Sequence, residues 1–233
     1  MKSGSFTKRE LNHLLNFIGY GRPEADIWFL GMEEAGGGED NLRARLQFEQ
    51  IEDLARAHSI LGITKHHSGR KVIQPTWRGM CYILLKLNGQ PTDSESIREY
   101  QAEKLGRFHG DTFLFELMPI PKPKINSWGY ENFIPQFHST LEYYETVKPQ
   151  RIRLLRQFIQ QHQPKIVIGY GKMHWKSYQA LFPQIVFKQK NEFLAGEKDN
   201  TFVLLTHHFT AREMNRKLDD VVLLIRHYLR KIS

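Results

Sequence analysis

Four short runs of apolar residues, each followed by a polar or glycine-containing loop, constrain the fold of this chain more than any other feature. The runs occupy residues 26–31, 112–118, 165–170 and 201–206. Segments with helical periodicity lie between and after them. Strands that are apolar throughout and alternate with helices are typical of a parallel sheet covered on both faces. The sequence therefore predicts a single α/β domain over residues 1–233, a three-layer sandwich around a central four-stranded, mainly parallel sheet.

The positions of the helices are predicted from apolar periodicity and from capping motifs. The segments that begin at Thr92 and Thr210 both have the Thr-x-x-Glu pattern of a capping box. We expect helices at residues 41–58, 79–87, 92–105, 152–162 and 174–181, a short edge strand at 185–188, and a last helix that begins at Thr210.

Composition excludes several classes of protein. The 233 residues are 40% hydrophobic and 25% charged, which excludes a disordered, collagen-like or coiled-coil chain. The single cysteine, Cys81, excludes a disulfide framework, a zinc ribbon and a protein-ligated iron–sulfur cluster. No apolar run approaches the ~20 residues that span a bilayer, and the charged start has no apolar core of a signal peptide. We therefore expect a cytoplasmic protein with no membrane partner.

Positive charge is concentrated in one segment of the chain. The net charge is +8, from 33 Lys and Arg against 25 Asp and Glu. Residues 146–191 contain no Asp or Glu and carry +9, with Tyr170, Trp175 and Tyr178 interleaved. Basic residues alternating with aromatic ones suit backbone tracking and base stacking on nucleic acid. The alternative is that the aromatic side chains belong to the core and the lysines to an ordinary solvated face.

Ligands of parallel α/β sheets bind beyond the carboxyl ends of the strands, so the loops there are the candidate site. The first of them contains two adjacent carboxylates, Glu33 and Glu34, followed by three glycines. A carboxylate in such a loop can position water or a cation, although the Gly-Lys-Ser/Thr of a P-loop is missing. The four candidate loops are residues 31–38, 116–124, 169–174 and 206–210.

Two adjacent histidines follow the last apolar run. His207 and His208 precede the helix N-terminus expected at Thr210, a position that favours anions. A histidine there can hydrogen-bond negative charge that develops on a leaving group. Alternatively, one of the two packs in the interior and the other is exposed. We expect no metal site, because the spacing of these histidines from His66 and His67 matches no known ligand motif.

Five short motifs occur in an order and spacing that match one known family. They are residues 25–36, 75–80, 115–121, 164–172 and 205–209. Four lie at the ends of the apolar runs and one lies between the first two runs. Together they resemble the motifs of the uracil-DNA glycosylase superfamily, and the single cysteine excludes its iron–sulfur branch. The resemblance implies a uracil-DNA glycosylase-like α/β fold.

The resemblance also implies roles for individual residues. Glu33 occupies the position of the acidic or amide residue that handles the catalytic water, and His207 that of the histidine in the last motif. Both are therefore expected to be catalytic. Glu116 lies where the family has the asparagine that reads the base edge, so it is expected to bind the base together with Gly31 and Met32. Contacts with DNA are expected from Lys122, Lys124, Lys172, His174, His208 and Arg212.

The departures from the family pattern affect the expected substrate. The proline of the first motif is absent and its loop is one residue longer, and His208 replaces a proline. Glu116 replaces the asparagine, and an ionised carboxylate can only accept hydrogen bonds. It would repel O4 of uracil unless it were protonated, so the identity of the base stays open.

The expected function is that of a monofunctional DNA glycosylase in base-excision DNA repair. Such a hydrolase breaks the N-glycosidic bond of a damaged or deaminated base flipped out of single- or double-stranded DNA. It needs no cofactor or metal, and we expect a monomer. The alternative is a catalytically inactive module on the same fold that binds nucleic acid or a nucleotide. A weaker third reading is a phosphate-handling hydrolase that depends on a divalent metal.

Overall fold

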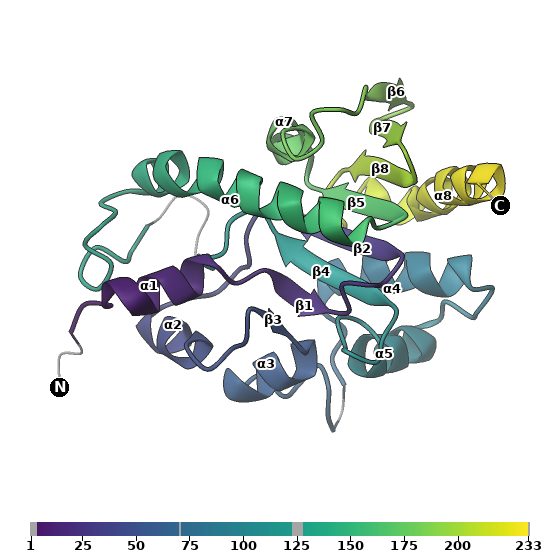
Figure 1. Cartoon of the computed structure of the whole chain (residues 1–233). Helices are drawn as coiled ribbons and strands as arrows, with labels where there is room; N and C mark the ends of the chain where they lie inside the picture. Colours follow the sequence, from purple (N-terminus) through teal and green to yellow (C-terminus); the bar gives the residue numbers. More distant parts are fainter. Residues whose placement is uncertain (1–3, 70, 123–127, 233) are drawn as a thin grey trace.

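The computed structural model describes residues 4–69, 71–122 and 128–232. Within these residues the chain forms one mixed sheet of eight strands with helices on both faces (Figure 1). The strand order is β3-β1-β4-β2-β5-β8-β7-β6. The predicted α/β class is confirmed. The prediction of four strands is wrong, because two further strands extend the sheet on each side.

The four predicted apolar runs form the centre of the sheet. They are β4 (Thr112–Glu116), β2 (Ile27–Gly31), β5 (Ile166–Tyr170) and β8 (Thr201–Thr206), and all four are parallel. These strands are apolar throughout because both of their faces are covered. Their carboxyl ends lie at one edge of the sheet, so the loops that follow them meet there.

Most of the outer strands were missed, and all of them except β7 are only two or three residues long. β1 (Gly19–Gly21) is antiparallel to β4 and parallel to β3 (Ile51–Glu52). β7 (Phe193–Lys198) is antiparallel to both β8 and β6 (Lys188–Lys190). Only β6 was expected, at residues 185–188. A strand of two or three residues has no recognisable periodicity, so its pairing partner decides its structure.

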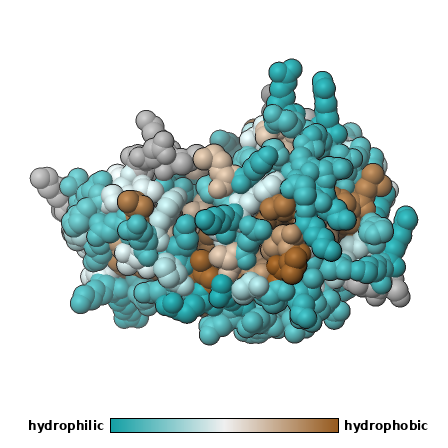
Figure 2. Space-filling view, turned by 90° about the horizontal axis from the view of Figure 1, so that it is seen from above, coloured by the Kyte–Doolittle hydropathy of each residue, from teal (hydrophilic) through white to brown (hydrophobic). Residues whose placement is uncertain are grey.

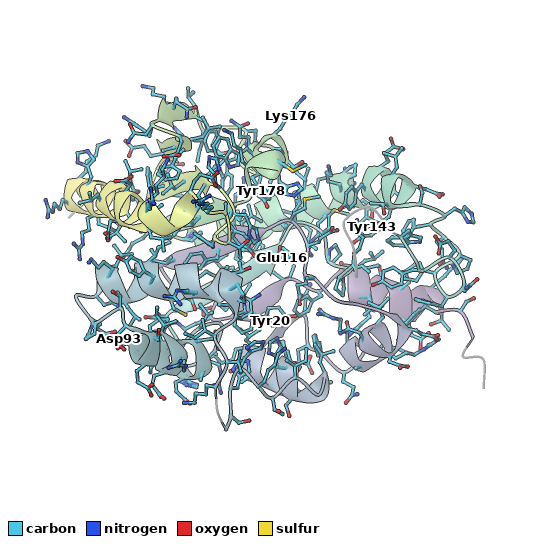
Figure 3. The ribbon with its side chains drawn as sticks, turned by 180° about the vertical axis from the view of Figure 1, so that it is seen from behind. Tyr20, Asp93, Glu116, Tyr143, Lys176 and Tyr178 are labelled. Atoms are coloured by element: carbon cyan, nitrogen blue, oxygen red, sulfur yellow. The ribbon has the colours of Figure 1, made fainter. Side chains whose placement is uncertain are left out.

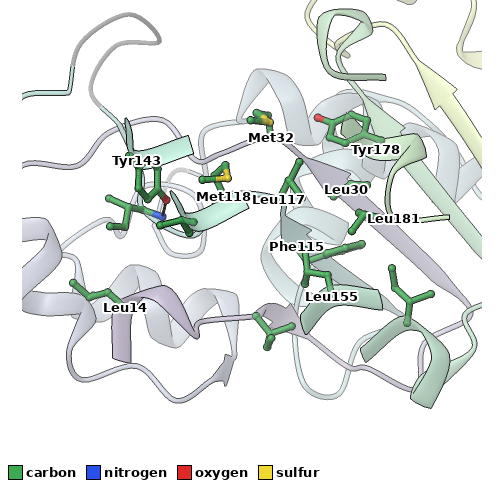
Figure 4. Packing of buried hydrophobic residues seen from close by; sticks show 14 of the residues in the cluster. Leu14, Leu30, Met32, Phe115, Leu117, Met118, Tyr143, Leu155, Tyr178 and Leu181 are labelled. Atoms are coloured by element: carbon green, nitrogen blue, oxygen red, sulfur yellow. Dashed lines mark hydrogen bonds between the residues drawn. The ribbon is translucent and has the colours of Figure 1, made fainter. Parts of the chain in front are cut away.

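One face of the sheet is covered by α1 (Lys8–Leu15), α6 (Thr140–His162) and α7 (Trp175–Gln179). α6 crosses in front of the sheet in Figure 1. Its Tyr143 and Leu155 belong to a single buried cluster with strand residues of this face (Figure 4).

The opposite face is covered by α3 (Leu54–Ile60), α4 (Pro75–Leu87), α5 (Ser94–Glu103) and α8 (Leu218–Ile232). These helices and the other face of the strands form a second buried cluster. The sheet and the helices on each of its faces form the three layers expected from the sequence. No helix in the described part of the chain is both long and apolar enough to cross a lipid bilayer.

Two of the predicted helices are corrected by the structure. Residues 41–58 do not form one helix: α2 (Glu39–Arg45) ends early, the chain pairs with β1 as β3, and Asp53 then caps α3. The last helix does not begin at Thr210, because a 3-10 turn at Met214–Arg216 precedes α8. The expected anion site at a helix N-terminus is therefore absent from this loop.

The starts of α6 and α5 also differ from the predictions. α6 begins after Ser139 and continues through Pro149, whereas a helix was expected only from residue 152. Asp93 caps α5 instead of Thr92, and its carboxylate accepts from the backbone N–H groups of Glu95 and Ser96. Aspartate at this position is as good an N-cap as threonine.

Candidate functional site

A cleft of about 750 Å³ opens at the edge of the sheet where the four parallel strands end. A smaller cavity of about 60 Å³ lies behind it. The two share residues of the β2, β4 and β5 ends and of the adjacent helices, so the cavity is the inner end of the cleft. On the same measure about 10–15 Å³ holds one water molecule, so the cavity has room for several waters or for one edge of a larger ligand. The shared residues are Glu34, His58, Trp77, Glu116 and Tyr170.

Glu116, at the end of β4, is the innermost acid of the cleft and lies near the centre of the molecule (Figure 3). The Tyr170 hydroxyl donates to its Oε1 at 2.8 Å. Its Oε2 is shielded from solvent and has no partner among the described residues. Gly31 makes this arrangement possible, because a Cβ there would lie 2.0 Å from Oε2 and 2.4 Å from the tyrosine oxygen.

Burial, with Glu34 adding to it, raises the pKa of Glu116 to about 8. The neutral acid therefore predominates at pH 7. Its proton lies on Oε2, because Oε1 accepts from Tyr170. Glu116, which lines the cavity, thus has a donor without an acceptor, packed against Gly31. The repulsion of a carbonyl oxygen expected for an ionised carboxylate does not arise.

Arg151 is the second polar group with an unused atom in this cavity. It projects from α6, is 2% exposed, and donates to the carbonyl oxygens of Ile18, Glu116 and Leu117 at 3.1–3.3 Å. Its Nη1 has no partner in the part of the chain that the structure describes. Burial lowers its pKa to about 10, so it remains charged at neutral pH. Two residues that line this small cavity therefore each have a buried donor without an acceptor in the described chain.

Glu33 lies on the wall of the outer cleft and is held from two sides. The Tyr144 hydroxyl donates to its Oε2 at 2.7 Å, and Lys122 Nζ lies 3.3 Å from its Oε1. Burial raises the pKa of Glu33, and the tyrosine and the lysine partly offset that rise. Lys122 is only 3% exposed, so the structure places it in the interior and not on a surface that meets phosphates.

Glu34 has a different environment from its neighbour in the sequence. Arg45 forms a bidentate ion pair with the Glu34 carboxylate at 2.7 and 3.0 Å, and the Tyr20 hydroxyl donates to the same carboxylate at 2.8 Å. Burial alone would raise the pKa of Glu34, but Arg45 outweighs burial and the net pKa is lowered. Glu34 is therefore ionised at neutral pH and occupied by Arg45 and Tyr20, whereas Glu33 is paired with Lys122 and Tyr144.

An uncharged aromatic wall borders the cleft opposite the acids. His58 stacks on Trp77 with ring centroids 5.2 Å apart, and Nε2 of His67 lies 3.0 Å from Nδ1 of His58. Burial, with His67 adding to it, lowers the pKa of His58 to about 3, so its ring is neutral. Such a wall suits stacking on a planar ligand. Among the described residues, no three His, Cys, Asp or Glu side chains are grouped as metal ligands would be.

The two adjacent histidines lie in different environments. His208 is exposed, lines the cleft, and has Nδ1 2.7 Å from the Thr210 hydroxyl. His207 is half-buried, meets the Trp175 ring edge-on at 6.0 Å, and has a buried Nε2 without a partner in the described chain. It is not among the residues that line the cleft. The cleft thus receives His208, whereas the sequence assigned the catalytic role to His207.

The remaining predicted site residues are scattered. Met32 is 8% exposed and packs in the core cluster with Met118 (Figure 4), so base binding does not fit its position. Lys172 and Arg212 are exposed. Burial, with Lys148 nearby, lowers the pKa of the half-buried His174. Lys124 lies outside the described residues.

Five side chains of the site were not among the site residues predicted from the sequence. Tyr170 ends an apolar run and resembled a core residue, and Arg151 resembled a solvated cation in a basic segment. Arg151 follows Tyr143 and Val147 at four-residue spacing on the buried side of α6. This spacing can be recognised only when the helix is known to begin at Thr140. The other three are His58, Trp77 and Tyr144.

The fold is that of an α/β protein with a cleft at the carboxyl edge of a mixed sheet. No protein-family model matches the chain, and no curated protein is significantly similar to it.

Proposed function

We propose that this protein is a DNA glycosylase-like hydrolase that acts on a flipped base bearing a ring carbonyl, such as a deaminated base. The observation that carries the proposal is the pair of unused donors in the inner cavity, Oε2–H of Glu116 and Nη1–H of Arg151. Deamination replaces an exocyclic amine, which donates, with a carbonyl oxygen, which accepts. A cavity with two buried donors therefore favours the deaminated base over its parent.

The arrangement of the cleft is compatible with glycosidic hydrolysis. Bond cleavage leaves positive charge on the sugar and negative charge on the base. Glu33, on the outer wall, stabilises the cationic sugar and orients the attacking water. Glu116 and Arg151 donate to the carbonyl oxygen, which gains negative charge as the base leaves. Water supplies the hydroxyl group to the sugar carbon and a proton to the base, so no cofactor takes part.

Exposed cations that follow β5 are suited to the phosphate backbone of DNA. Lys172 and Lys176 are both exposed in this segment, and Lys176 projects outward from α7 in Figure 3. Not all of the basic segment is available for this purpose, since Arg151 is buried and Arg156 donates to the carbonyl oxygen of Ala180. Hydrophilic side chains cover most of the face above α6 and α7, and the hydrophobic patches on it are small and separate (Figure 2).

Base release from modified oligonucleotides tests the proposal. The panel carries uracil, hypoxanthine, xanthine and an oxidised guanine in single and double strands, with enzyme in excess and chelator present, followed by alkaline cleavage of abasic sites. We expect strand breaks with at least one deaminated base. Glu33→Gln should abolish them, whereas Glu116→Gln, which keeps a donor and an acceptor, should retain more activity than Glu116→Ala. No break with any base at enzyme excess would refute the proposal.

The ion pair of Glu33 with Lys122 favours a second candidate, a binding module without turnover. A carboxylate held at 3.3 Å by a buried lysine is less able to stabilise a cationic sugar than a free one. This candidate predicts salt-dependent DNA binding that Glu33→Gln leaves unchanged, with no base release in any assay. A single-turnover experiment distinguishes it from the hydrolase.

A further inference from the structure

A groove of about 400 Å³ is lined by residues of α8, β6 and β7. These three elements lie at the end of the sheet away from α1 and β3 in Figure 1. The groove shares no lining residue with the cleft. Its volume is within the range of small-molecule sites, about 300–1,000 Å³. It is therefore separate from the site of the proposed function.

The groove exists because the layer of helices ends before the sheet does. All three residues of β6 are exposed, whereas β7 packs against α8 through Phe193 and Ala195. Gly196 lies in the floor, where a Cβ would approach the Val186 carbonyl oxygen to 2.9 Å. Gly196 lets residues 185–186, which precede β6, pass close to β7. The small side chain of Ala195 leaves room for the groove.

Lysines form the outer rim of the groove. Lys188 pairs with Ala195 and Lys190 with Phe193. Because cross-strand partners project from the same face of a sheet, both lysines project on the side of α8. His227 lines the groove from α8. Neither lysine forms an ion pair with a described residue, whereas Lys231 on the same helix pairs with Glu197. The rim is thus cationic.

The inner wall of the groove is apolar except for one hydroxyl. Tyr228 is 3% exposed and stacks on Phe202 with centroids 4.9 Å apart. Its Oη is buried and has no hydrogen-bond partner within the described chain. Val186, which is 76% exposed, and Leu224 flank the opening. A buried hydroxyl without a partner is costly, and a ligand oxygen would satisfy it.

We propose that this groove binds a small amphiphilic anion. The apolar body of the ligand lies between Val186 and Leu224, and its acidic group meets Lys188 and Lys190. An oxygen of the ligand accepts from the Tyr228 hydroxyl. A purely apolar ligand would leave the lysines and the hydroxyl unused, and a bare inorganic anion would leave the apolar walls exposed.

Anilinonaphthalene sulfonate, a fluorescent aromatic sulfonate, is the probe that tests this proposal. We expect it to bind the folded protein with enhanced fluorescence. Lys188→Glu combined with Lys190→Glu should weaken binding at least tenfold, and Tyr228→Phe at least threefold. Lys8→Glu, an exposed charge reversal on α1, should have no effect. Equal binding by all variants would overturn the proposal.

Competition identifies the chemistry of the ligand. Decanoate should displace the probe, and decanol, which has the same body and no charge, should not. Displacement by decanol at the same concentration would overturn the requirement for an anion. Displacement by a thymidine oligonucleotide, and not by decanoate, would assign the groove to nucleic acid and overturn the proposal. The charge reversals lie on an exposed strand, so thermal unfolding should show the variants folded.

Discussion

The hydroxyl of Tyr170 donates a 2.8 Å hydrogen bond to one oxygen of Glu116, and the other oxygen has no partner in the described parts of the chain. This relationship joins the ends of β4 and β5 and determines which oxygen holds the proton. Under the proposed function, the tyrosine is a positioning residue, since it acts on the base through the acid.

Replacing Tyr170 with phenylalanine should move the pH profile of base release. The hydrogen bond from Tyr170 lowers the pKa of Glu116 and so opposes burial. Without it the pKa rises further above about 8, and the neutral acid persists to higher pH. The alkaline limb of kcat/KM should therefore shift upward. A downward shift in Tyr170→Phe would contradict the assigned role, and an unchanged Tyr130→Phe profile is the control.

Replacing Glu116 with glutamine should stabilise the protein increasingly as pH rises. The carboxyl titrates near 4.5 when the chain is unfolded and near 8 when it is folded. Between these values only the folded state keeps the proton, so the free energy of unfolding of the wild type falls as pH rises. Glutamine does not titrate. The difference in Tm between variant and wild type should widen from pH 5 to pH 8, at about 2–4 °C per kcal/mol for a chain of this size.

A Tm difference that is constant between pH 5 and pH 8 would show that Glu116 is already ionised in the folded protein. The variant Glu142→Gln, on the same helix as Arg151, serves as a control for removing one carboxylate elsewhere.

Substitution of the two adjacent acids, Glu33 and Glu34, should affect stability and base release differently. Glu34→Gln leaves the buried Arg45 without its ion pair, so we expect a loss of roughly 3–5 kcal/mol in the free energy of unfolding. Glu33→Gln keeps its hydrogen bond with Tyr144 but removes the charge partner of Lys122, whose side chain is also buried, so it too should lose stability. What separates Glu33 from Glu34 is catalysis: base release should fall by about 10²–10⁴-fold in Glu33→Gln. Denaturant unfolding and single-turnover assays on the same preparations measure both effects, and unchanged base release in Glu33→Gln would refute the assignment.

Alanine at His208 should reduce base release at least tenfold, and alanine at His207 should change it less than threefold. His208 lines the cleft, whereas the ring of His207 faces Trp175. His207→Ala should instead lower the Tm, because it removes a packed ring. If His207→Ala abolishes activity at unchanged Tm, the catalytic histidine is His207, as the family resemblance implies, and not the histidine that lines the cleft.

Removing one exposed lysine that follows β5 should reduce the salt dependence of DNA binding. Lys172→Ala and Lys176→Ala should each lower the slope of log Kd against log salt concentration by about 1, if each side chain contacts one phosphate. Fluorescence anisotropy at several salt concentrations gives the slope. Lys8→Ala, on α1, is the matched control. Identical slopes in all three variants would place the DNA elsewhere.

The central sheet could be predicted from the sequence because its cause is local. Each of the four parallel strands is buried on both faces, so its residues are apolar without interruption and stand out in the chain. The cleft lies at the common carboxyl edge because the four central strands are parallel. Glu33 and Glu116 were placed at that edge for the same reason.

Only the tertiary structure decided the state of each polar group in the cleft, because that state depends on residues distant in the sequence. Glu33 and Glu34 are neighbours, yet one pairs with Lys122 and the other with Arg45. Arg151 carries an ordinary cationic side chain, but α6 buries it beside Glu116. Burial then keeps that acid neutral. The sequence by itself determined where the site lies, and packing determined which of its atoms are free to meet a ligand.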